Sequence, residues 1–278
     1  MKIFNEFKNL VVYDNTMFHL QETEEAYHKY VTKLMELTPN QLATFVNVLK
    51  KNELINNQEN ETEDPFIVEL QLEQQRIDSI QAASKIINDK HTINKDELQK
   101  LHKLVIKGSQ DDRRENYNYR TFPTKVGKVI NGEEIISYIP PETSEEIDED
   151  INIILNFLND DSSAQLIDTI FLKPLVAHAL IAILQPFGNG NTRLSRVVQH
   201  AKIMDITNKY YNLNLKYPVL YLSKNYLLTH PVYRGHIGRL AEHQDDIYWN
   251  KWFEYNLNML DEQLYFVNNK LDTYIAKK

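Results

Sequence analysis

Hydrophobic residues recur at the spacing of amphipathic α-helices along most of the chain. The pattern is clear from Glu22, and Leu98, Leu101 and Val105 mark a further helix in the same way. Residues 167–184 are apolar nearly all round, which predicts a central buried helix. The helices predicted in this way span residues 22–37, 38–51, 66–90, 94–107, 143–158, 167–184, 192–206 and 249–275.

Residues that start and stop helices stand at several of these boundaries. Thr38 is an expected N-cap, and Pro39 follows it at the first helical position. Thr143 with Glu146 three residues later predicts a capping box, and Gly108 is expected to end the helix of residues 94–107. The chain should therefore be mainly helical.

One segment has the pattern of strands. In VGKVINGEEIISYIPP, β-branched runs flank Asn131 and Gly132, a dipeptide typical of a tight hairpin turn. We therefore expect a single hairpin at residues 126–139. Residues 56–65 are polar, acidic and end in proline, which is typical of a linker. The predicted organisation is an N-terminal helical extension with a linker over residues 1–65, followed by a main domain over residues 66–278.

The composition fits a protein with a substantial hydrophobic core, because 42% of the 278 residues are hydrophobic. No apolar run reaches the roughly 18 residues that span a bilayer, and the first residues lack the apolar stretch of a secretion signal. We expect a cytoplasmic protein, or an effector delivered without such a signal, with no membrane partner. The absence of cysteine excludes disulfides and thiolate chemistry.

The charge argues against nucleic acid as a partner. The net charge is −8, whereas phosphate contacts along a nucleic acid need clustered Lys and Arg. Arg113 and Arg114 form only a short basic patch beside Asp111 and Asp112, and we interpret it as solvated.

Two of the seven glycines, Gly188 and Gly190, lie between two predicted helices and just before Arg193 and Arg196. Glycines at this place let backbone N–H groups converge, and the N-terminus of the next helix adds a positive dipole end. The two arginines are three residues apart and so share a helix face, which suits phosphate binding. The segment predicts an anion-binding loop, although glycines also end ordinary helices and arginines are often solvated.

The sequence QPFGNGNTRLSR, residues 185–196, resembles in length and order the Fic family signature H-P-F-x-[D/E]-G-N-G-R-x-x-R. We call these residues the motif loop. The resemblance extends over about residues 66–260 and includes Tyr119 and Arg120 before the hairpin. It implies a helical Fic-type domain whose hairpin is a flap that docks a target segment by strand addition.

Most Fic proteins transfer AMP from ATP to a hydroxyl side chain of a target protein. The resemblance assigns the catalytic base to position 185, a Mg²⁺-holding acid to position 189, and the nucleotide phosphates to the loop and its arginines. The implied nucleotide-binding residues are Gly188, Gly190, Asn191, Thr192, Arg193, Arg196 and Tyr233, and the implied target-docking residues of the flap are Val129, Ile130, Ile135 and Ile136.

Two positions of the signature differ in their chemistry, because Gln185 replaces the histidine and Asn189 replaces the acid. An amide does not accept a proton near neutral pH, and a positioned general base is typically worth about 10²–10⁴-fold in rate. Asn189 offers Mg²⁺ a neutral oxygen instead of a carboxylate, so metal binding should be weakened. We therefore expect a protein that binds ATP or another nucleotide without the usual AMP transfer.

A third departure concerns regulation. Many Fic proteins carry an inhibitory helix whose glutamate pairs with the second motif arginine, and here QQRIDSI, residues 74–80, stands in its place. Asp78 would take the role of that glutamate within the predicted helix of residues 66–90. The same segment also fits an ordinary amphipathic helix.

Two other functions stay open. One is an active transferase with non-standard chemistry, in which Gln185 orients the acceptor hydroxyl. The other is a non-catalytic protein that binds a partner through its flap and helical extension, although a relic would not need the retained Asn191 and Arg196. An engineered exchange of the histidine alone would not explain Asn189 or Asp78.

The remaining histidines offer no strong metal site. His230, His236 and His243 are six and seven residues apart, which does not place a pair on one helical turn as a zinc site requires. His178 lies within the buried apolar run, so we expect a hydrogen-bonded core histidine that supports the motif loop.

Overall fold

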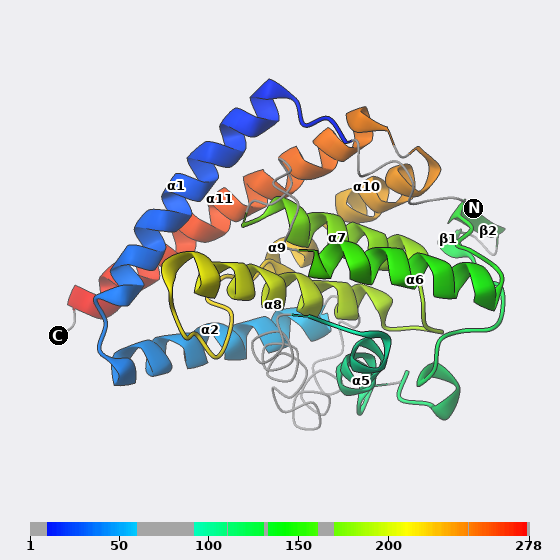
Figure 1. Ribbon diagram of the computed structural model, residues 1–278, viewed down its shortest axis with the longest axis horizontal. Coiled ribbons are helices and arrows are strands. Elements are labelled where there is room, and N and C mark those ends of the chain that lie inside the picture. The colour runs from blue at the N-terminus through cyan, green and yellow to red at the C-terminus, as the bar shows by residue number, and fades with distance from the viewer. Residues whose placement is uncertain are drawn as a thin grey trace.

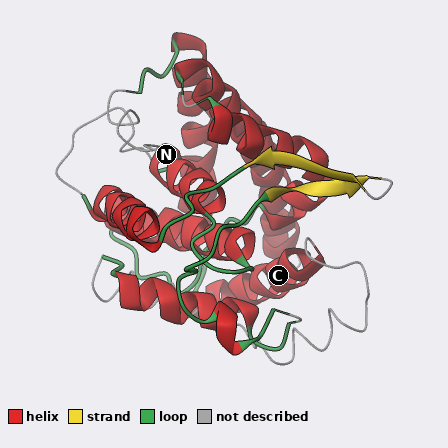
Figure 2. Ribbon diagram, turned by 90° about the vertical axis from the view of Figure 1, so that its right-hand side faces the viewer, coloured by secondary structure: helices red, strands yellow, loops and turns green. Residues whose placement is uncertain are grey.

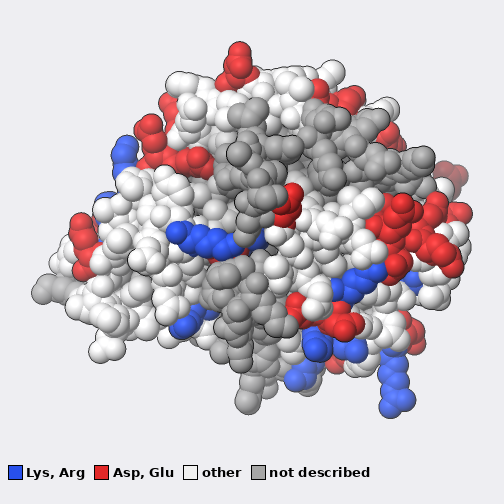
Figure 3. Space-filling view, viewed as in Figure 1, with Lys and Arg blue, Asp and Glu red and all other residues white. Residues whose placement is uncertain are grey.

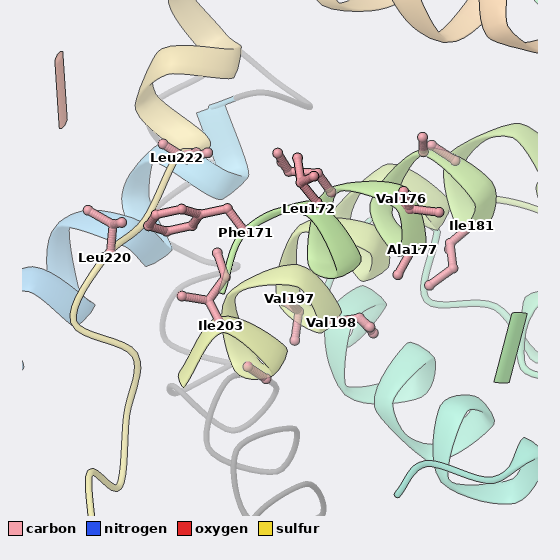
Figure 4. Close-up of a cluster of buried hydrophobic side chains, with 14 of the residues drawn as sticks. Phe171, Leu172, Val176, Ala177, Ile181, Val197, Val198, Ile203, Leu220 and Leu222 are labelled. Atoms are coloured by element: carbon pink, nitrogen blue, oxygen red, sulfur yellow. The ribbon is translucent and has the colours of Figure 1, made fainter. Parts of the chain in front are cut away.

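Two buried helices form the centre of the fold. A computed structural model of the chain describes residues 10–59, 92–109, 111–130, 133–160, 170–243 and 245–276. In it, α7 (Leu172–Leu184) and α8 (Asn191–Tyr211) lie side by side inside a layer of other helices (Figure 1). All 13 residues of α7 are buried, as its apolar sequence predicts. Figure 4 shows apolar side chains of α7 and α8 gathered in one cluster.

The mainly helical architecture with a single hairpin is confirmed within the described residues. The other helices are α1 (Asp14–Met35), α2 (Pro39–Glu59), α5 (Lys95–Ile106), α6 (Ser144–Asn159), α9 (Ser223–Leu228), α10 (His230–Glu242) and α11 (Asp246–Ala276), with a short 3₁₀ helix, η2, at Arg114–Asn116. The predicted helix of residues 66–90, with Asp78, lies outside the described residues.

Helix caps confirm several predicted boundaries. The Thr143 hydroxyl accepts a hydrogen bond from the backbone N–H of Glu146 at 3.2 Å, and the Glu146 carboxylate accepts one from the N–H of Thr143, which completes the predicted capping box of α6. Gly108 follows α5 with a φ of +77°, a left-handed conformation that favours glycine after a helix. α2 begins at Pro39, as predicted.

The helical extension differs from its predicted bounds at both ends. α1 begins at Asp14, eight residues before the predicted start, and Thr16 occupies a buried position there that the hydrophobic pattern did not reveal. α2 continues to Glu59, so residues 56–59 of the predicted linker are helical.

The hairpin projects from the helical body (Figure 2). Strands β1 (Val126–Ile130) and β2 (Glu133–Tyr138) pair in antiparallel fashion. Gly127 lies so close to β2 that a Cβ atom there would sit 2.2 Å from the carbonyl oxygen of Ile135. The base of the hairpin is tied to the helices, since Arg234 Nη2 donates to the Gly127 carbonyl at 2.6 Å and the Tyr138 hydroxyl donates to the Ala182 carbonyl at 2.9 Å.

Two further observations concern the apolar length of the described helices and the charge on the described surface. None of the described helices is long and apolar enough to cross a membrane. On the face in Figure 3, basic side chains stand singly or in small groups among acidic ones in the part of the surface that is described.

Helix α1 packs along α11, and a histidine links them. His19 bonds through Nδ1 to Glu254 Oε2 at 2.8 Å and through Nε2 to Asp261 Oδ2 at 2.9 Å. Both ring nitrogens can donate to carboxylates only when the imidazole is protonated. Partial burial lowers the pKa of His19, but the hydrogen bonds to Glu254 and Asp261 outweigh it, and the pKa is raised above 6.5.

We expect the contact of His19 to stabilise the protein in a pH-dependent way. Because the pKa is raised in the folded state, this stabilisation is complete below about pH 6.5 and is lost as the pH rises through the folded value. Urea unfolding of wild type and His19→Gln between pH 5 and 9 measures it. The difference between the two proteins should shrink with rising pH, and a constant difference would contradict the assignment.

Candidate functional site

The motif loop connects α7 to α8 through two residues with left-handed backbones. Gln185 ends α7 with φ +49° and ψ +58°, and Gly190 precedes α8 with φ +76°. A Cβ atom on Gly190 would also lie 2.4 Å from Ile106 Cγ2, and one on Gly188 would lie 2.2 Å from Asn116 Oδ1. The backbone conformation therefore favours glycine at position 190, whereas a side chain at position 188 would have to displace the amide of Asn116.

The side chain of Asn191 closes the loop from inside. Its Oδ1 accepts from the Phe187 N–H at 3.0 Å, while its Nδ2 donates to the Phe187 carbonyl at 3.0 Å and to Gln185 Oε1 at 2.9 Å. Asn191 is buried, so these hydrogen bonds fix the path of the loop before α8 begins.

Arg120 holds the entry to the loop. Its guanidinium donates to the carbonyl oxygens of Gln185 at 2.6 Å and Leu184 at 3.2 Å, and to those of Pro141 and Phe122 at 2.6 and 2.9 Å. Arg120 is 1% exposed. The buried cation therefore joins the end of α7 to the segments on both sides of the hairpin.

A neutral histidine supports the loop from α5. The rings of His102 and Phe187 stack with centroids 3.7 Å apart, and His102 Nε2 donates to the Asn189 carbonyl at 2.7 Å. Burial lowers the pKa of His102 to about 4, although the hydrogen bond to Asn189 acts in the opposite direction. At neutral pH the single ring proton is therefore on Nε2, and the Asn189 carbonyl accepts the hydrogen bond from this N–H.

Gln185, at the position of the signature histidine, is bound within the loop. Its Nε2 donates to the Ala182 carbonyl at 2.6 Å, and its Oε1 accepts from Asn191. The side chain can orient a neighbouring hydroxyl by hydrogen bonding, but an amide does not take up a proton at neutral pH.

Asn189, at the position of the signature acid, contacts the carboxylate of Asp111. Its Nδ2 donates to Asp111 Oδ1 at 2.6 Å, and its Oδ1 accepts from the Gly190 N–H at 2.8 Å. No group of three His, Asp or Glu side chains suited to a metal occurs in the described part of the chain. The residues around Asn189 therefore do not fit a Mg²⁺ site formed by the protein alone.

Arg193 and Arg196 are each 1% exposed, so neither is the solvated surface charge that an ordinary helix would carry. Arg193 Nη2 lies 2.5 Å from Asp111 Oδ2. Nε and Nη1 of Arg193 are buried and have no hydrogen-bond partner among the described residues. A buried guanidinium with two unsatisfied donors at the start of a helix suits an anionic ligand.

A cavity of about 340 Å³ lies beside the loop. It is bounded by the base of the hairpin, the motif loop and α10, so the structure brings the loop and the hairpin together. The lining residues are Val126, Ser137, Tyr138, Ala182, Gln185, Thr192, Arg196, His230, Tyr233, Arg234 and Ile237.

His178 is the buried, hydrogen-bonded core histidine that the sequence predicts. Its Nε2 lies 2.9 Å from the Tyr233 hydroxyl, and its Nδ1 bonds to Gln199 Oε1. Complete burial lowers the pKa of His178 to about 3, so the ring is neutral. Nδ1 then donates to Gln199, and Nε2 accepts from Tyr233, which holds this tyrosine at the wall of the cavity.

The flap residues are placed in part. Ile135 and Ile136 on β2 are 46% and 43% exposed and can contact a partner. Val129 and Ile130 pair with Glu134 and Glu133 in the hairpin, but their side chains lie outside the described residues.

Sequence reasoning missed two contributors and left a third without a role. Asp111 was interpreted only as part of a short charged patch, His102 was not considered, and Arg120 was noted solely for its place before the hairpin. No periodic pattern identifies Asp111, because its contact with Arg193 joins residues 82 positions apart.

Comparison with known proteins finds one family model that matches part of the chain, together with several similar structures. Residues 92–201 match the family model described as the Fic/DOC family. A Fic domain containing signaling protein from Bacteroides thetaiotaomicron has a similar structure, with a TM-score of 0.68 and 12% identity over 90% of this chain and 97% of that one. A Fic family protein from Desulfovibrio desulfuricans has a TM-score of 0.65 and 15% identity, and the match covers 94% of this chain and 76% of that one. Fic-1 (aa134–508) from C. elegans has a TM-score of 0.58 and 14% identity, and the match covers 94% of this chain and 71% of that one. No curated protein matches the sequence.

These likenesses show a mainly helical Fic-like fold, with a two-stranded antiparallel hairpin and N-terminal helices. At 12–15% sequence identity, these structures support a conclusion about the fold and about nothing further.

Proposed function

We propose, starting from the Fic/DOC family domain at residues 92–201, that this protein binds the phosphate groups of a nucleotide at its motif loop without performing ordinary AMP transfer. The observation that carries the proposal is the buried guanidinium of Arg193 at the N-terminus of α8, with two donor atoms that have no partner in the part of the chain that the structure describes. Phosphate oxygens bind such donors strongly, because both the cation and the helix dipole favour negative charge.

The cavity beside the loop supports a nucleotide rather than a lone anion. Thr192 and Arg196 line it next to Gln185, and Tyr233 stands across it on α10. A volume of about 340 Å³ is in the range of small-molecule sites. We therefore place the phosphates at the arginines and the nucleoside in the cavity.

Gln185 and Asn189 support the loss of ordinary transfer. Attack of a target hydroxyl on the α-phosphate requires a group that takes the hydroxyl proton, and Gln185 does not supply one. Fic proteins typically use ATP with Mg²⁺, which would supply charge stabilisation at the phosphates. Here the neutral Asn189 oxygen already accepts the Gly190 N–H.

The hairpin supports binding of a protein segment next to the nucleotide. Both β1 and β2 have an outer edge, since the described sheet contains only these two strands. An extended peptide can pair with such an edge by backbone hydrogen bonds, while Ile135 and Ile136 offer apolar contact. A target with a hydroxyl side chain, or a partner that is bound and not modified, would lie here.

Calorimetry with ATP, ADP and AMP tests the proposal. We expect ATP and ADP to bind more tightly than AMP, because Arg193 and Arg196 meet the outer phosphates, and Mg²⁺ should change the affinity little. Arg193→Ala with Arg196→Ala should weaken ATP binding by at least about 100-fold, since each charge-assisted contact is worth about 1.5–3 kcal/mol. Arg113→Ala, which removes an exposed arginine, is the matched control.

Two outcomes would count against this function. Absence of heat with every nucleotide at millimolar concentration would exclude nucleotide binding. Equal ATP binding by the double variant and wild type, with circular dichroism showing both to be folded, would place the nucleotide elsewhere.

A further inference from the structure

An internal carboxylate stands at the anion-binding position of the motif loop. Asp111 Oδ2 lies 2.5 Å from Arg193 Nη2, and Asp111 Oδ1 accepts from Asn189 Nδ2 at 2.6 Å. Both partners are at the N-terminus of α8, where the backbone adds a positive dipole end. Asp111 thus makes the contacts that an oxygen-bearing anion would make there.

The segment that carries Asp111 is held against the loop. We call residues 111–117 the strap. Asn116 Nδ2 donates to the Asp111 carbonyl at 2.9 Å, and the Tyr117 hydroxyl donates to Asp112 Oδ1 at 2.6 Å. Asn116 also sits directly over Gly188, as the 2.2 Å distance to a Cβ atom there shows. The strap is therefore packed in a position that delivers Asp111 to Arg193.

The carboxylate satisfies only part of the site. Arg193 is 1% exposed and keeps Nε and Nη1 without a partner among the described residues, while the side chain of Asp111 is 22% exposed. A phosphate group has more acceptor oxygens than a carboxylate and can meet more of these donors. Asp111 is at the solvent side of the pair, so it is the partner that can leave.

We propose that Asp111 is a built-in competitor for the phosphate site, so that a polyphosphate ligand must displace the Asp111 carboxylate from Arg193 before it binds. This inference rests on the proposed function, because it concerns regulation of the same loop. The unliganded protein is then mostly in the Asp111-bound form, and the apparent affinity is reduced by the small fraction that is open.

Inorganic pyrophosphate is a direct probe, because it carries the phosphate chemistry without a nucleoside. Calorimetry should show that Asp111→Asn binds pyrophosphate at least about tenfold more tightly than wild type. Glu115→Gln is the matched control, since it removes the same charge from an exposed position of the strap, and it should bind like wild type. Unchanged or weaker binding by Asp111→Asn would overturn the competitor role.

Loss of the counter-ion should also destabilise the unliganded variant, because Arg193 stays buried without a carboxylate. Pyrophosphate should therefore raise the Tm of Asp111→Asn by more than it raises that of wild type. If the variant does not fold, hydrogen exchange of wild type gives the answer. Pyrophosphate should increase exchange in residues 111–117, and unchanged or slower exchange there would overturn the proposal.

Binding of pyrophosphate and ATP distinguishes failure of the phosphate site from failure of Asp111 displacement. If neither wild type nor Asp111→Asn binds pyrophosphate or ATP, the proposed phosphate site is wrong and the competitor role falls with it. If both bind equally, the phosphate site stands and only displacement of Asp111 is refuted.

Discussion

Gln185→His combined with Asn189→Asp is expected to give transfer of AMP from ATP to the protein or to an added hydroxyl-bearing peptide, where wild type gives little or none. The general base alone should raise the rate by about 10²–10⁴-fold. This is the largest change in activity that we expect, because it supplies a proton acceptor in a loop whose shape and charge are already in place.

The backbone favours this replacement. Gln185 has a left-handed conformation, with φ of +49°, which histidine adopts more readily than most residues. The Ala182 carbonyl, which now accepts from Gln185 Nε2, can accept from one ring N–H, which leaves the other ring nitrogen unprotonated and able to take a proton. When the hydroxyl oxygen attacks the α-phosphorus and pyrophosphate leaves, the imidazole takes the hydroxyl proton.

The carboxylate introduced by Asn189→Asp would stand next to Asp111, in place of the amide that now donates to it. Two carboxylates at this distance repel each other, so the double variant should already loosen the strap. Adding Asp111→Asn should raise the activity further, and adding Arg196→Ala should abolish it. Incorporation of label from α-³²P-ATP, followed on a gel, measures each variant. A double variant that binds ATP and labels nothing would show that more than these two residues separates this loop from a transferase.

Arg120→Ala should produce the largest loss of stability. Its guanidinium donates to four backbone carbonyls while 1% exposed, and removal leaves these acceptors without their donor, two of them in buried hydrogen bonds. The expected cost is about 3–5 kcal/mol in the free energy of unfolding, because hydrogen bonds to a charged group contribute about 1.5–3 kcal/mol each and two of these bonds are buried. Arg120→Lys should recover only part of it, since an ammonium group cannot reproduce the planar fork.

Urea denaturation of these variants measures the effect, with Arg114→Ala as the control at an exposed arginine nearby. The control should change stability by no more than about 0.5 kcal/mol. A loss below about 1 kcal/mol for Arg120→Ala would mean that water replaces the guanidinium at these carbonyls. The motif loop would then be held chiefly by Asn191 and His102.

The fold was largely predictable because its signals are local. Apolar spacing predicts the buried helix α7, and β-branched runs around Asn131 and Gly132 predict the hairpin. The predicted start of α1 was late for a physical reason. Thr16, which lies before the predicted start, is completely buried, so a polar residue occupies a core position.

The candidate site was predictable only in its contiguous part. Glycines and arginines within residues 185–196 indicate an anion-binding loop by themselves. The hydrogen bonds of Asp111, His102 and Arg120 to the motif loop join residues 65 to 87 positions apart, and no local pattern encodes them. Burial of Arg193 was also unpredictable, because it depends on how α5 and the strap pack against α8.

The contact between His102 and the Asn189 carbonyl gives this protein an internal reporter. The pKa of His102 is about 4, so its ring does not change charge between pH 6 and 9. Its Nε2–H is buried in a hydrogen bond to the motif loop and should give a resolved downfield proton resonance with slow solvent exchange. A ligand-induced change of that resonance would report movement of the loop backbone and not titration, which makes His102 a spectroscopic observer of the site in the unmodified chain.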